Sequence, residues 1–398
     1  MSSERRVSMS KNNIGVTGLI RDYPEFKYST KELIDILGNK LSEQVKENIY
    51  GLGVEERYFT RPIESYIKIP SAKINSIDDN EPISDLSAKI VNQCLEKLGL
   101  KHDDIKCLLV GYENNDYMSP GLGSITLTKA GFSKFLPHFN IQGMACSTFP
   151  KLLELGKNLI HDENDKVLVV ISGCNSGWYL PHLKDNMAIK NPKEIGLNQY
   201  DREKQIGKWI STMFSFLFGD GVTAFLLSKI NEGQNALRIG KITHAVNFDN
   251  SDYKKACVRL VGRSENHHYE YELSAGADIL TRSLEYSKKV LMKSLNKPID
   301  SFDDSAAKIY MENQQKVMIH TGSLKILNGF KNMYNLSDNQ IQESYDTLKH
   351  YGNLTGVSIP TVLDKAITNN SWKTGKGLLV GITMGFGLDL VEIEKIRA

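Results

Sequence analysis

The chain has 398 residues, of which 40% are hydrophobic and 24% are charged, and its 49 Lys and Arg against 47 Asp and Glu leave a net charge of +2. This composition excludes a disordered or collagen-like chain. It also excludes a protein dedicated to nucleic-acid binding, which would concentrate basic residues. The length suffices for two or three domain-sized units with a large buried core.

The N-terminal segment and the cysteines indicate the compartment. The N-terminus has no apolar run of signal-peptide length, and no apolar run in the chain approaches the roughly 20 residues of a membrane span. We therefore expect a cytoplasmic protein without a membrane span. The five cysteines are odd in number and form no C-x-x-C pair, so neither a disulfide framework nor a zinc site is expected.

Short apolar strands alternate with amphipathic segments that have a 3.6-residue period. In chain order we predict helix 85–99, strand 106–110, strand 139–142, a helix that follows Cys146, strand 166–171, helix 274–295, strand 316–319, a helix from near Ser337 to His350, and strand 377–383. This alternation predicts an α/β protein with mostly parallel sheets.

The order helix, strand, polar loop occurs once in each half of the chain, which suggests a duplicated architecture with a boundary near residues 229–240. We divide the chain accordingly into residues 1–232 and residues 233–398. The polar stretches 183–208 and 245–270 are interpreted as surface loops or lids.

The first candidate for chemistry is Cys146, in the segment Gly143-Met-Ala-Cys146-Ser between a predicted strand and a predicted helix. Unpaired N–H groups and positive partial charge at a helix N-terminus would lower the pKa of its thiol. A thiolate at neutral pH is a nucleophile. The alternative is a buried cysteine that acts as a small apolar residue.

Two further candidates lie in the second half. His320 follows the buried strand 316–319, at the end of a sheet where α/β proteins place chemistry, although a structural histidine fits the same pattern. Asn353, in Tyr351-Gly-Asn353, is either a turn residue or a fixed amide donor to an oxyanion.

Two glycine-containing turns, over residues 218–225 and 381–389, adjoin predicted strands. Neither is followed by a helix with a phosphate-binding or dinucleotide-binding fingerprint, so nucleotide binding is not predicted. Gly385 and Gly387 would instead let the backbone approach a ligand closely.

Together these motifs resemble the thiolase-fold condensing enzymes: ketoacyl-ACP synthase III, and its relatives the chalcone-synthase-like type III polyketide synthases and HMG-CoA synthase. Their order and spacing agree through most of the chain. The matching segments are Gly53-Val-Glu-Glu-Arg57, Ala145-Cys146-Ser, Phe218-Gly-Asp-Gly221, His320-Thr-Gly-Ser-Leu-Lys325, Tyr351-Gly-Asn353 and Gly385-Phe-Gly387.

The resemblance implies an α/β protein with the thiolase fold, in five layers, α-β-α-β-α, from two similar halves. It implies that Cys146 accepts an acyl group from acyl-CoA or acyl carrier protein. A malonyl-type or β-ketoacyl-type thioester would then attack the acyl-cysteine, with loss of CO2 in a decarboxylative Claisen condensation. His320 and Asn353 would stabilise the enolate.

The same resemblance implies further site residues and partners. The backbone N–H groups of Cys146 and Leu388 would form an oxyanion hole, and Arg57, Gly385 and Gly387 would bind substrate. A charged surface arginine is the alternative for Arg57. No metal and no permanently bound cofactor is implied. The protein would be a homodimer, paired through the strand at 139–143 and the loop at 120–126, because an unpaired edge strand is a liability.

Two departures from the synthase III pattern favour specialised metabolism of polyketides or fatty-acid derivatives. Thr-Gly-Ser follows His320, and extra chain occupies 183–208. In addition, Glu113 follows a buried strand near the position of the catalytic glutamate of HMG-CoA-synthase-like members. It is either a general base or a solvated loop acid.

Other functions remain open from the sequence. Within the family, the acyl group could pass to an acceptor without decarboxylation, or Glu113 could support an aldol condensation like that of HMG-CoA synthase. More distant alternatives are a cysteine hydrolase of papain type, which also has Cys, His and Asn in this order, and a non-catalytic partner subunit.

Overall fold

Nine strands form one hydrogen-bonded sheet, which is the central element of the fold. The computed structural model describes residues 13–67, 81–184, 188–196, 199–231, 234–254, 256–263, 269–275, 279–383 and 385–396. In sheet order the strands are β11 (Lys316–Ile319), β12 (Gly375–Thr383), β13 (Gly387–Ile396), β8 (Ala236–Val246), β1 (Ile14–Asp22), β7 (Val222–Lys229), β6 (Val167–Ser172), β4 (Cys107–Tyr112) and β5 (His138–Gln142).

The sheet has two parts that join at a narrow seam. Strands β1 and β8 pair through only two residue pairs, Gly15 with Arg238 and Val16 with Leu237. On one side of this seam lie β7, β6, β4 and β5, and on the other β13, β12 and β11. The chain crosses from one part to the other between the end of β7 and the start of β8.

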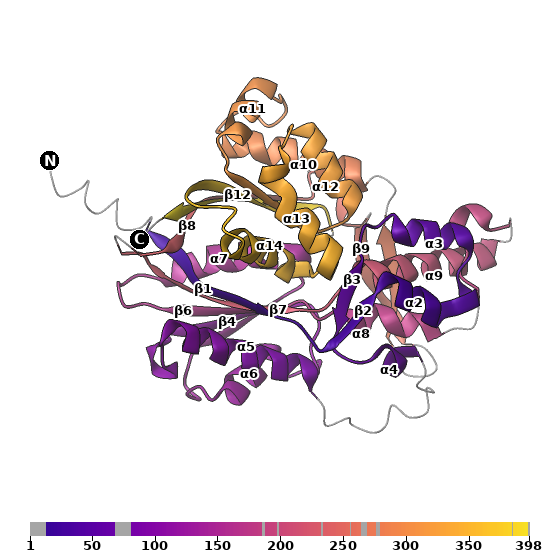
Figure 1. The fold of residues 1–398 in the computed structure, drawn as a ribbon, viewed down its shortest axis with the longest axis horizontal. Coiled ribbons are helices and arrows are strands. Elements are labelled where there is room, and N and C mark those ends of the chain that lie inside the picture. Colours follow the sequence, from indigo (N-terminus) through magenta and orange to yellow (C-terminus); the bar gives the residue numbers. More distant parts are fainter. Residues whose placement is uncertain are drawn as a thin grey trace.

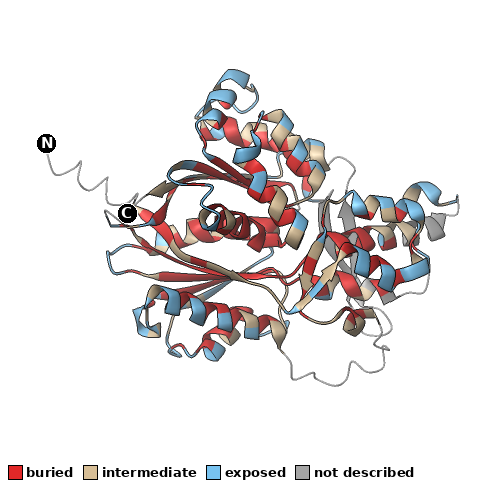
Figure 2. Ribbon diagram, in the orientation of Figure 1, coloured by how far each residue is buried: buried red, intermediate tan, exposed pale blue. Residues whose placement is uncertain are grey.

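Helices separate and cover the two parts, which gives five layers (Figure 1). Two helices, α7 (Thr148–Leu159) and α14 (Ser358–Thr368), lie between the parts of the sheet, and eight of the 11 residues of α14 are buried (Figure 2). The outer helices are α5 (Pro82–Leu98) and α6 (Leu122–Ala130) on one side, and α10 (Ile279–Ser294), α11 (Asp304–Glu312), α12 (Leu324–Met333) and α13 (Asp338–Tyr351) on the other. The layering expected from the sequence is therefore present.

A lobe beside these layers, at the right of Figure 1, has an apolar core of its own. It contains α2 (Thr30–Leu37), α3 (Glu43–Tyr50), α4 (Ile63–Ile67), α8 (Ser176–Tyr179), α9 (Gln199–Leu217) and the paired strands β2 (Phe26–Ser29) and β3 (Glu56–Phe59). A separate two-stranded ladder joins β9 (Ala256–Arg263) to β10 (Tyr269–Ala275), and β10 contacts α9.

Several local predictions agree with these elements. The strand predicted at 316–319 is β11. The helix predicted at 85–99 is α5, which has a proline in its first turn and ends at Gly99, where φ is 64° in the left-handed region that glycine tolerates.

Other local predictions are wrong. Of the eight neighbouring strand pairs in the main sheet, five are antiparallel and three are parallel. Apolar runs had indicated parallel strands, but here helices bury both faces of the sheet whatever the strand direction.

The stretches predicted to be loops, 183–208 and 245–270, contain part of α9 and parts of β8, β9 and β10. The helix predicted from residue 274 begins at Ile279.

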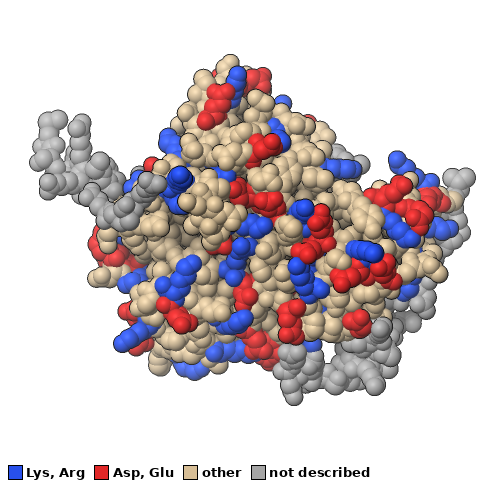
Figure 3. All heavy atoms as spheres, viewed as in Figure 1, with Lys and Arg blue, Asp and Glu red and all other residues tan. Residues whose placement is uncertain are grey.

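The exterior agrees with the near-neutral net charge. On the face drawn in Figure 3, basic and acidic side chains are interspersed over all the layers, with no large area of one sign. Among the described helices, none combines the length and the apolar character that crossing a bilayer requires.

Candidate active site

Cys146 lies in a tight turn between β5 and α7. Gly143 and Ala145 before it have φ of 80° and 43°, and the short 3-10 turn Ala145–Ser147 then leads into α7. A positive φ is uncommon for alanine and reflects strain that the surrounding structure must hold. The Cys146 side chain is only 6% exposed. The predicted junction of strand and helix is therefore present, as a bent connection.

His320 is positioned by the end of β11. Its backbone N–H donates to Val380 O of the neighbouring strand β12 at 2.9 Å, and the side chain is buried. Its Nδ1 has no hydrogen-bond partner among the described residues. Burial lowers the pKa of His320 to about 3, so the ring is uncharged at neutral pH and one of its nitrogens is a proton donor.

Asn353 is held so that one end of its amide is free to donate. Its Oδ1 accepts from the Thr355 backbone N–H at 2.8 Å, which assigns Nδ2 as the outward end of the amide. Its backbone N–H donates to Leu217 O at 2.8 Å, and its carbonyl accepts from Gly219 N at 3.1 Å. The Asn353 amide also favours the charged form of the Cys146 thiol and so acts to lower its pKa. The bond from Thr355 is that of a turn residue, while the amide lies at the cavity beside Cys146, as a donor would.

Two glycines allow this close approach of the turns at Gly219 and Asn353. A Cβ on Gly219 would lie 2.3 Å from Tyr351 O, and a Cβ on Gly352, where φ is 69°, would lie 2.3 Å from Leu217 O. Both contacts are too short for any side chain. The glycine turn at 218–221, which fits no nucleotide site, therefore serves to fix Asn353.

Asp220 in the same turn organises a neighbouring loop. Its fully buried carboxylate accepts from the backbone N–H groups of Thr60, Asn175 and Ser176 at 2.8 to 2.9 Å. The chain after β6 is thereby held against the turn that carries Asn353.

A cavity of about 660 Å³ joins these residues. Its lining includes the three sequence candidates Cys146, His320 and Asn353. The rest of its wall is largely aromatic and aliphatic, from Trp178, Tyr179, Phe214, Leu217, Phe218, Ile279, Ile326, Ile382 and Phe386. Such a wall suits an apolar acyl chain next to a small set of polar groups.

Glu113 also lines this cavity, so its interpretation as a solvated loop acid is wrong. The carboxylate accepts a hydrogen bond from the backbone N–H of Ala145, and the neighbouring N–H groups of Gly143 and Met144 also favour its charged form and lower its pKa. Successive N–H groups in such a turn form a nest for an anion. Desolvation outweighs these effects and raises the pKa of Glu113. The sequence could not show this, because the nest forms only when β4 and β5 pair.

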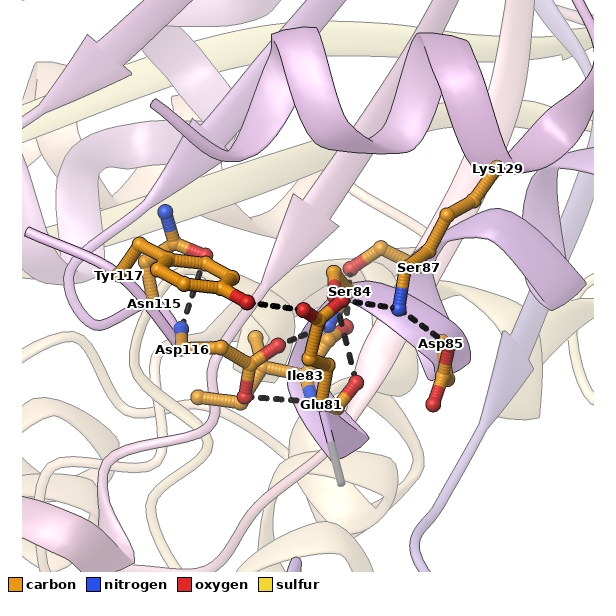
Figure 4. Close-up of polar contacts among 9 residues, drawn as sticks. All are labelled: Glu81, Ile83, Ser84, Asp85, Ser87, Asn115, Asp116, Tyr117 and Lys129. Atoms are coloured by element: carbon orange, nitrogen blue, oxygen red, sulfur yellow. Dashed lines mark hydrogen bonds and ion pairs between the residues drawn. The ribbon is translucent and has the colours of Figure 1, made fainter. Parts of the chain in front are cut away.

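The loop that carries Glu113 is fastened to the N-terminus of α5 (Figure 4). Asp116 accepts from the backbone N–H groups of Ile83 at 3.2 Å and of Ser84 at 2.8 Å. The Tyr117 hydroxyl donates to Glu81. Lys129 of α6 pairs with Glu81 and with Asp85 of α5, each at 2.5 Å. These contacts fix the loop immediately after Glu113.

The electrostatics of Cys146 differ from the expectation. Burial raises the pKa of its thiol, and the charge of Glu113 raises it further. The Asn353 amide and the backbone N–H of Cys146 act to lower this pKa, but their effects are smaller. The prediction that the helix N-terminus lowers this pKa is therefore wrong, because desolvation in the cavity prevails.

Arg57 does not lie where a ligand or solvent could reach it. It is fully buried, and its Nη2 donates to Thr30 Oγ1 at 2.6 Å and to Val54 O at 3.3 Å. Desolvation lowers the pKa of Arg57 to about 9. Both the predicted substrate contact and the surface alternative required an accessible guanidinium, so both are wrong.

The C-terminal glycine turn is only partly at the site. Gly385 lines the cavity, with φ of 73°. Gly387 and Leu388 are not among the lining residues: Leu388 lies inside β13, paired with Ile382 on one side and Ala245 on the other. The prediction of an oxyanion donor at Leu388 is thus not supported by its place in the ladder.

Sequence reasoning missed the residues that shape the cavity wall. Tyr179 follows a buried strand in the segment Ser-Gly-Trp-Tyr, Phe214 lies on α9, and Ser283 lies on α10. The apolar C-terminal end of α9 could have indicated this part of the wall. The polar N-terminal half of the same helix was instead interpreted as a surface loop. Within the described residues, no group of His, Cys, Asp and Glu could hold a metal ion.

Comparisons with known proteins agree with the fold. No protein-family model matches the chain. It is 24% identical over 327 residues to a β-ketoacyl-[acyl-carrier-protein] synthase III of Neisseria meningitidis, covering 79% of this chain and 85% of that protein. It is 21% identical over 328 residues to the synthase III of Latilactobacillus sakei, covering 81% and 86%.

Solved structures of OleA from Xanthomonas campestris are similar over almost the whole chain. A cerulenin-bound form has a TM-score of 0.69 and 16% identity, covering 96% of this chain and 97% of that one. A variant with glutamate changed to glutamine has a TM-score of 0.67 and 14% identity, covering 96% and 98%. The fold is therefore that of the thiolase family.

Proposed function

We propose that this chain, which has the thiolase fold and is similar to synthase III over most of its length, joins two acyl thioesters by a decarboxylative Claisen condensation with Cys146 as nucleophile. The observation that carries this proposal is the meeting of Cys146, His320 and Asn353, from three distant parts of the sequence, at one apolar cavity. A buried thiol, two uncharged donors and an apolar wall are what acyl transfer followed by carbanion chemistry requires.

In the first step the Cys146 sulfur attacks the carbonyl carbon of an acyl thioester. The bond from that carbon to the donor sulfur breaks, and the proton of Cys146 leaves with the released thiol. The Cys146 backbone N–H stabilises the oxyanion in this step. We propose that the second donor comes from the turn between β12 and β13, since Thr383 and Gly385 line the cavity and Leu388 does not.

In the second step a malonyl-type thioester enters the cavity and loses CO2. The electrons of the broken bond form an enolate whose oxygen accepts hydrogen bonds from His320 and Asn353. Its carbon then attacks the acyl-cysteine, and the Cys146 thiolate leaves. Neutral donors suit this role, because a positive imidazolium would be costly to bury, and the lowered pKa of His320 keeps the ring neutral.

Glu113 favours a second candidate function, in which condensation proceeds without decarboxylation. A half-buried carboxylate with a raised pKa, lining the same cavity as the nucleophile, is suited to remove a proton from the carbon next to a thioester carbonyl. The solved OleA structures include variants of a glutamate, a cysteine and a histidine of that protein, in this chain order. The two candidates differ in whether CO2 is released.

The proposal also covers the acyl donor, the cofactor, the compartment, the two halves of the chain and the oligomeric state. Cys146 would be loaded from acyl-CoA or from acyl carrier protein, with no permanently bound cofactor, in a cytoplasmic enzyme of specialised polyketide or fatty-acid-derived metabolism. We assign residues 1–232 and 233–398 to its two halves. A homodimer is supported by β5, which has a described strand neighbour on one side only and exposes 47% of Phe139.

Intact-protein mass spectrometry tests the proposal directly. After incubation with a panel of acyl-CoA and acyl-carrier-protein thioesters, the wild-type chain should gain the mass of one acyl group, mapped to Cys146. Cys146→Ala should gain none while keeping the wild-type circular dichroism spectrum. An adduct on Cys94, Cys107, Cys174 or Cys257 would contradict the assignment. Release of labelled CO2 from malonyl thioesters then decides between the two candidate functions.

A further inference from the structure

The cavity contains a buried hydroxyl that no described residue satisfies. Ser283 of α10 lines the cavity, is 3% exposed, and its Oγ has no hydrogen-bond partner. Buried polar side chains are nearly always hydrogen-bonded, so an exception in a ligand cavity needs a cause.

The neighbouring serine of the same helix shows the usual behaviour. Ser287, one turn further along α10, donates to Leu284 O at 2.7 Å and is 2.7 Å from the Tyr334 hydroxyl. Ser283 makes no such bond to its own helix. Its hydroxyl is therefore available to whatever occupies the cavity.

A second unpartnered atom lies in the same cavity wall. Asn175 is 1% exposed, and its Nδ2 donates to Thr355 Oγ1 at 3.0 Å, which leaves Oδ1 as an acceptor without a partner among the described residues. The lining also includes other polar side chains, Glu113, Gln142, Tyr179, Thr355 and Thr383. Apart from His320 Nδ1, Ser283 Oγ and Asn175 Oδ1 are the buried side-chain polar atoms of this lining that have no partner among the described residues. A ligand with only hydrocarbon at these points would leave both unsatisfied.

We propose that Ser283 is a specificity-determining residue that hydrogen-bonds a polar group of the acyl thioester, with Asn175 Oδ1 as a second contact. This inference rests on the proposed function. The group it recognises is an oxygen or an amide carried into the cavity by the substrate. It comes either from an oxygenated acyl chain or from the amides of the thioester arm.

The test measures acylation of Cys146 by intact mass, as kcat/KM, with three kinds of thioester of equal acyl length. These are saturated acyl-CoA, a set of hydroxyacyl-CoAs that differ in hydroxyl position, and a saturated acyl S-ethyl thioester, which has no amide. The variants are Ser283→Ala, Ser283→Thr, which keeps the hydroxyl, and Ser287→Ala as the matched control on α10. Thermal unfolding of each variant separates lost binding from lost stability.

Ser283→Ala should lower kcat/KM about 10-fold for the thioesters that carry the recognised group, as for a lost buried hydrogen bond, and Ser283→Thr should restore part of it. A loss confined to a hydroxyacyl-CoA identifies the acyl chain as the source. A loss on all CoA thioesters, but not on the S-ethyl thioester, identifies the arm. Ser287→Ala should lower the unfolding temperature and leave the ratios between thioesters unchanged.

An equal effect of Ser283→Ala on all three kinds of thioester, including no effect, would overturn the inference. The proposed function is tested separately. It is contradicted only if the wild-type protein acquires no acyl group on Cys146 from any thioester.

Discussion

In the proposed mechanism His320 and Asn353 are uncharged hydrogen-bond donors in a cavity with a largely apolar wall, so their contribution depends on the charge that develops during the reaction. In this mechanism acylation of Cys146 uses the sulfur and backbone donors, whereas decarboxylation uses donors directed at the thioester oxygen of the second substrate. If so, the two chemical steps depend on different atoms of one site, and we expect single substitutions to separate them.

We predict that His320→Ala and Asn353→Ala still acquire the acyl group on Cys146 but fail to release CO2 from a malonyl thioester. Each should lose about 10²-fold or more of condensation, as expected for a preorganised donor. The double variant should lose less than the product of the two, because both side chains act on one oxygen. Condensation by Asn353→Ala at near wild-type rate would count against this, and Glu113→Gln should then be the change that stops turnover.

The second residue-scale prediction concerns pH. The negative charge of Glu113 disfavours the Cys146 thiolate and so raises the pKa of the thiol. Glu113→Gln removes that charge, which should lower the pKa and shift the rise of acylation rate towards lower pH. Iodoacetamide labelling of Cys146 across a pH series measures the shift. Burial still acts on the thiol in this variant, so its pKa should remain above the ordinary value; an unchanged profile would show that the two groups are not coupled.

Among the elements, helix α5 is connected by hydrogen bonds to the loop that carries Glu113. Its N-terminal N–H groups are satisfied by Asp116, which lies three residues after Glu113 in the same loop. Helix N-termini attract carboxylates through unpaired N–H groups and the helix dipole. The outer layer therefore stabilises the loop that brings Glu113 to Cys146.

We predict that Asp116→Ala lowers the free energy of unfolding by about 1 kcal/mol, as for loss of a helix cap. It should also slow turnover if Glu113 is the base, because its loop loses an anchor. Asp85→Ala is the matched control on the same helix: its exposed ion pair with Lys129 should contribute less than about 1 kcal/mol. Urea denaturation of both variants provides the comparison, and an equal effect would remove the case for Asp116 as an anchor.

At the scale of the whole molecule, the open edge at β5 is the feature that bears on assembly. The strand ends the nine-stranded sheet, and it leads directly into the turn of Cys146. The residues Phe135, Phe139 and Met144 on or beside it are 94%, 47% and 38% exposed. An exposed apolar edge strand is a template for pairing with another chain.

We predict that the protein is a dimer at micromolar concentration in light scattering and that Phe139→Glu shifts it towards monomer. A charge placed in an apolar interface is costly to bury. The control is Ile309→Lys, whose side chain is 61% exposed on α11, one of the outer helices of the other part of the sheet. A wild-type monomer, or equal loss of dimer in both variants, would refute pairing through β5.

The sequence by itself determined the helices and strands that follow from a pattern of neighbouring residues, and the residues at the ends of these elements. Lys316–Ile319 is a strand, α5 ends at Gly99, and Cys146, His320 and Asn353 each follow an element end. These features depend on periodicity, turn chemistry and spacing, which neighbours in the chain supply. The resemblance to the thiolase-fold enzymes implied a shared site for the three side chains, and the packed structure places them at one cavity.

Only the tertiary structure decided the surroundings of these residues. Whether Glu113 is solvated or held in a nest, whether Arg57 is exposed or buried, and whether Leu388 faces the cavity or lies within a ladder depend on chains packed from elsewhere. The same holds for the pKa of Cys146, because desolvation and the charge of Glu113 act through space. Burial and electrostatics are properties of the packed molecule, and no pattern within one segment encodes them.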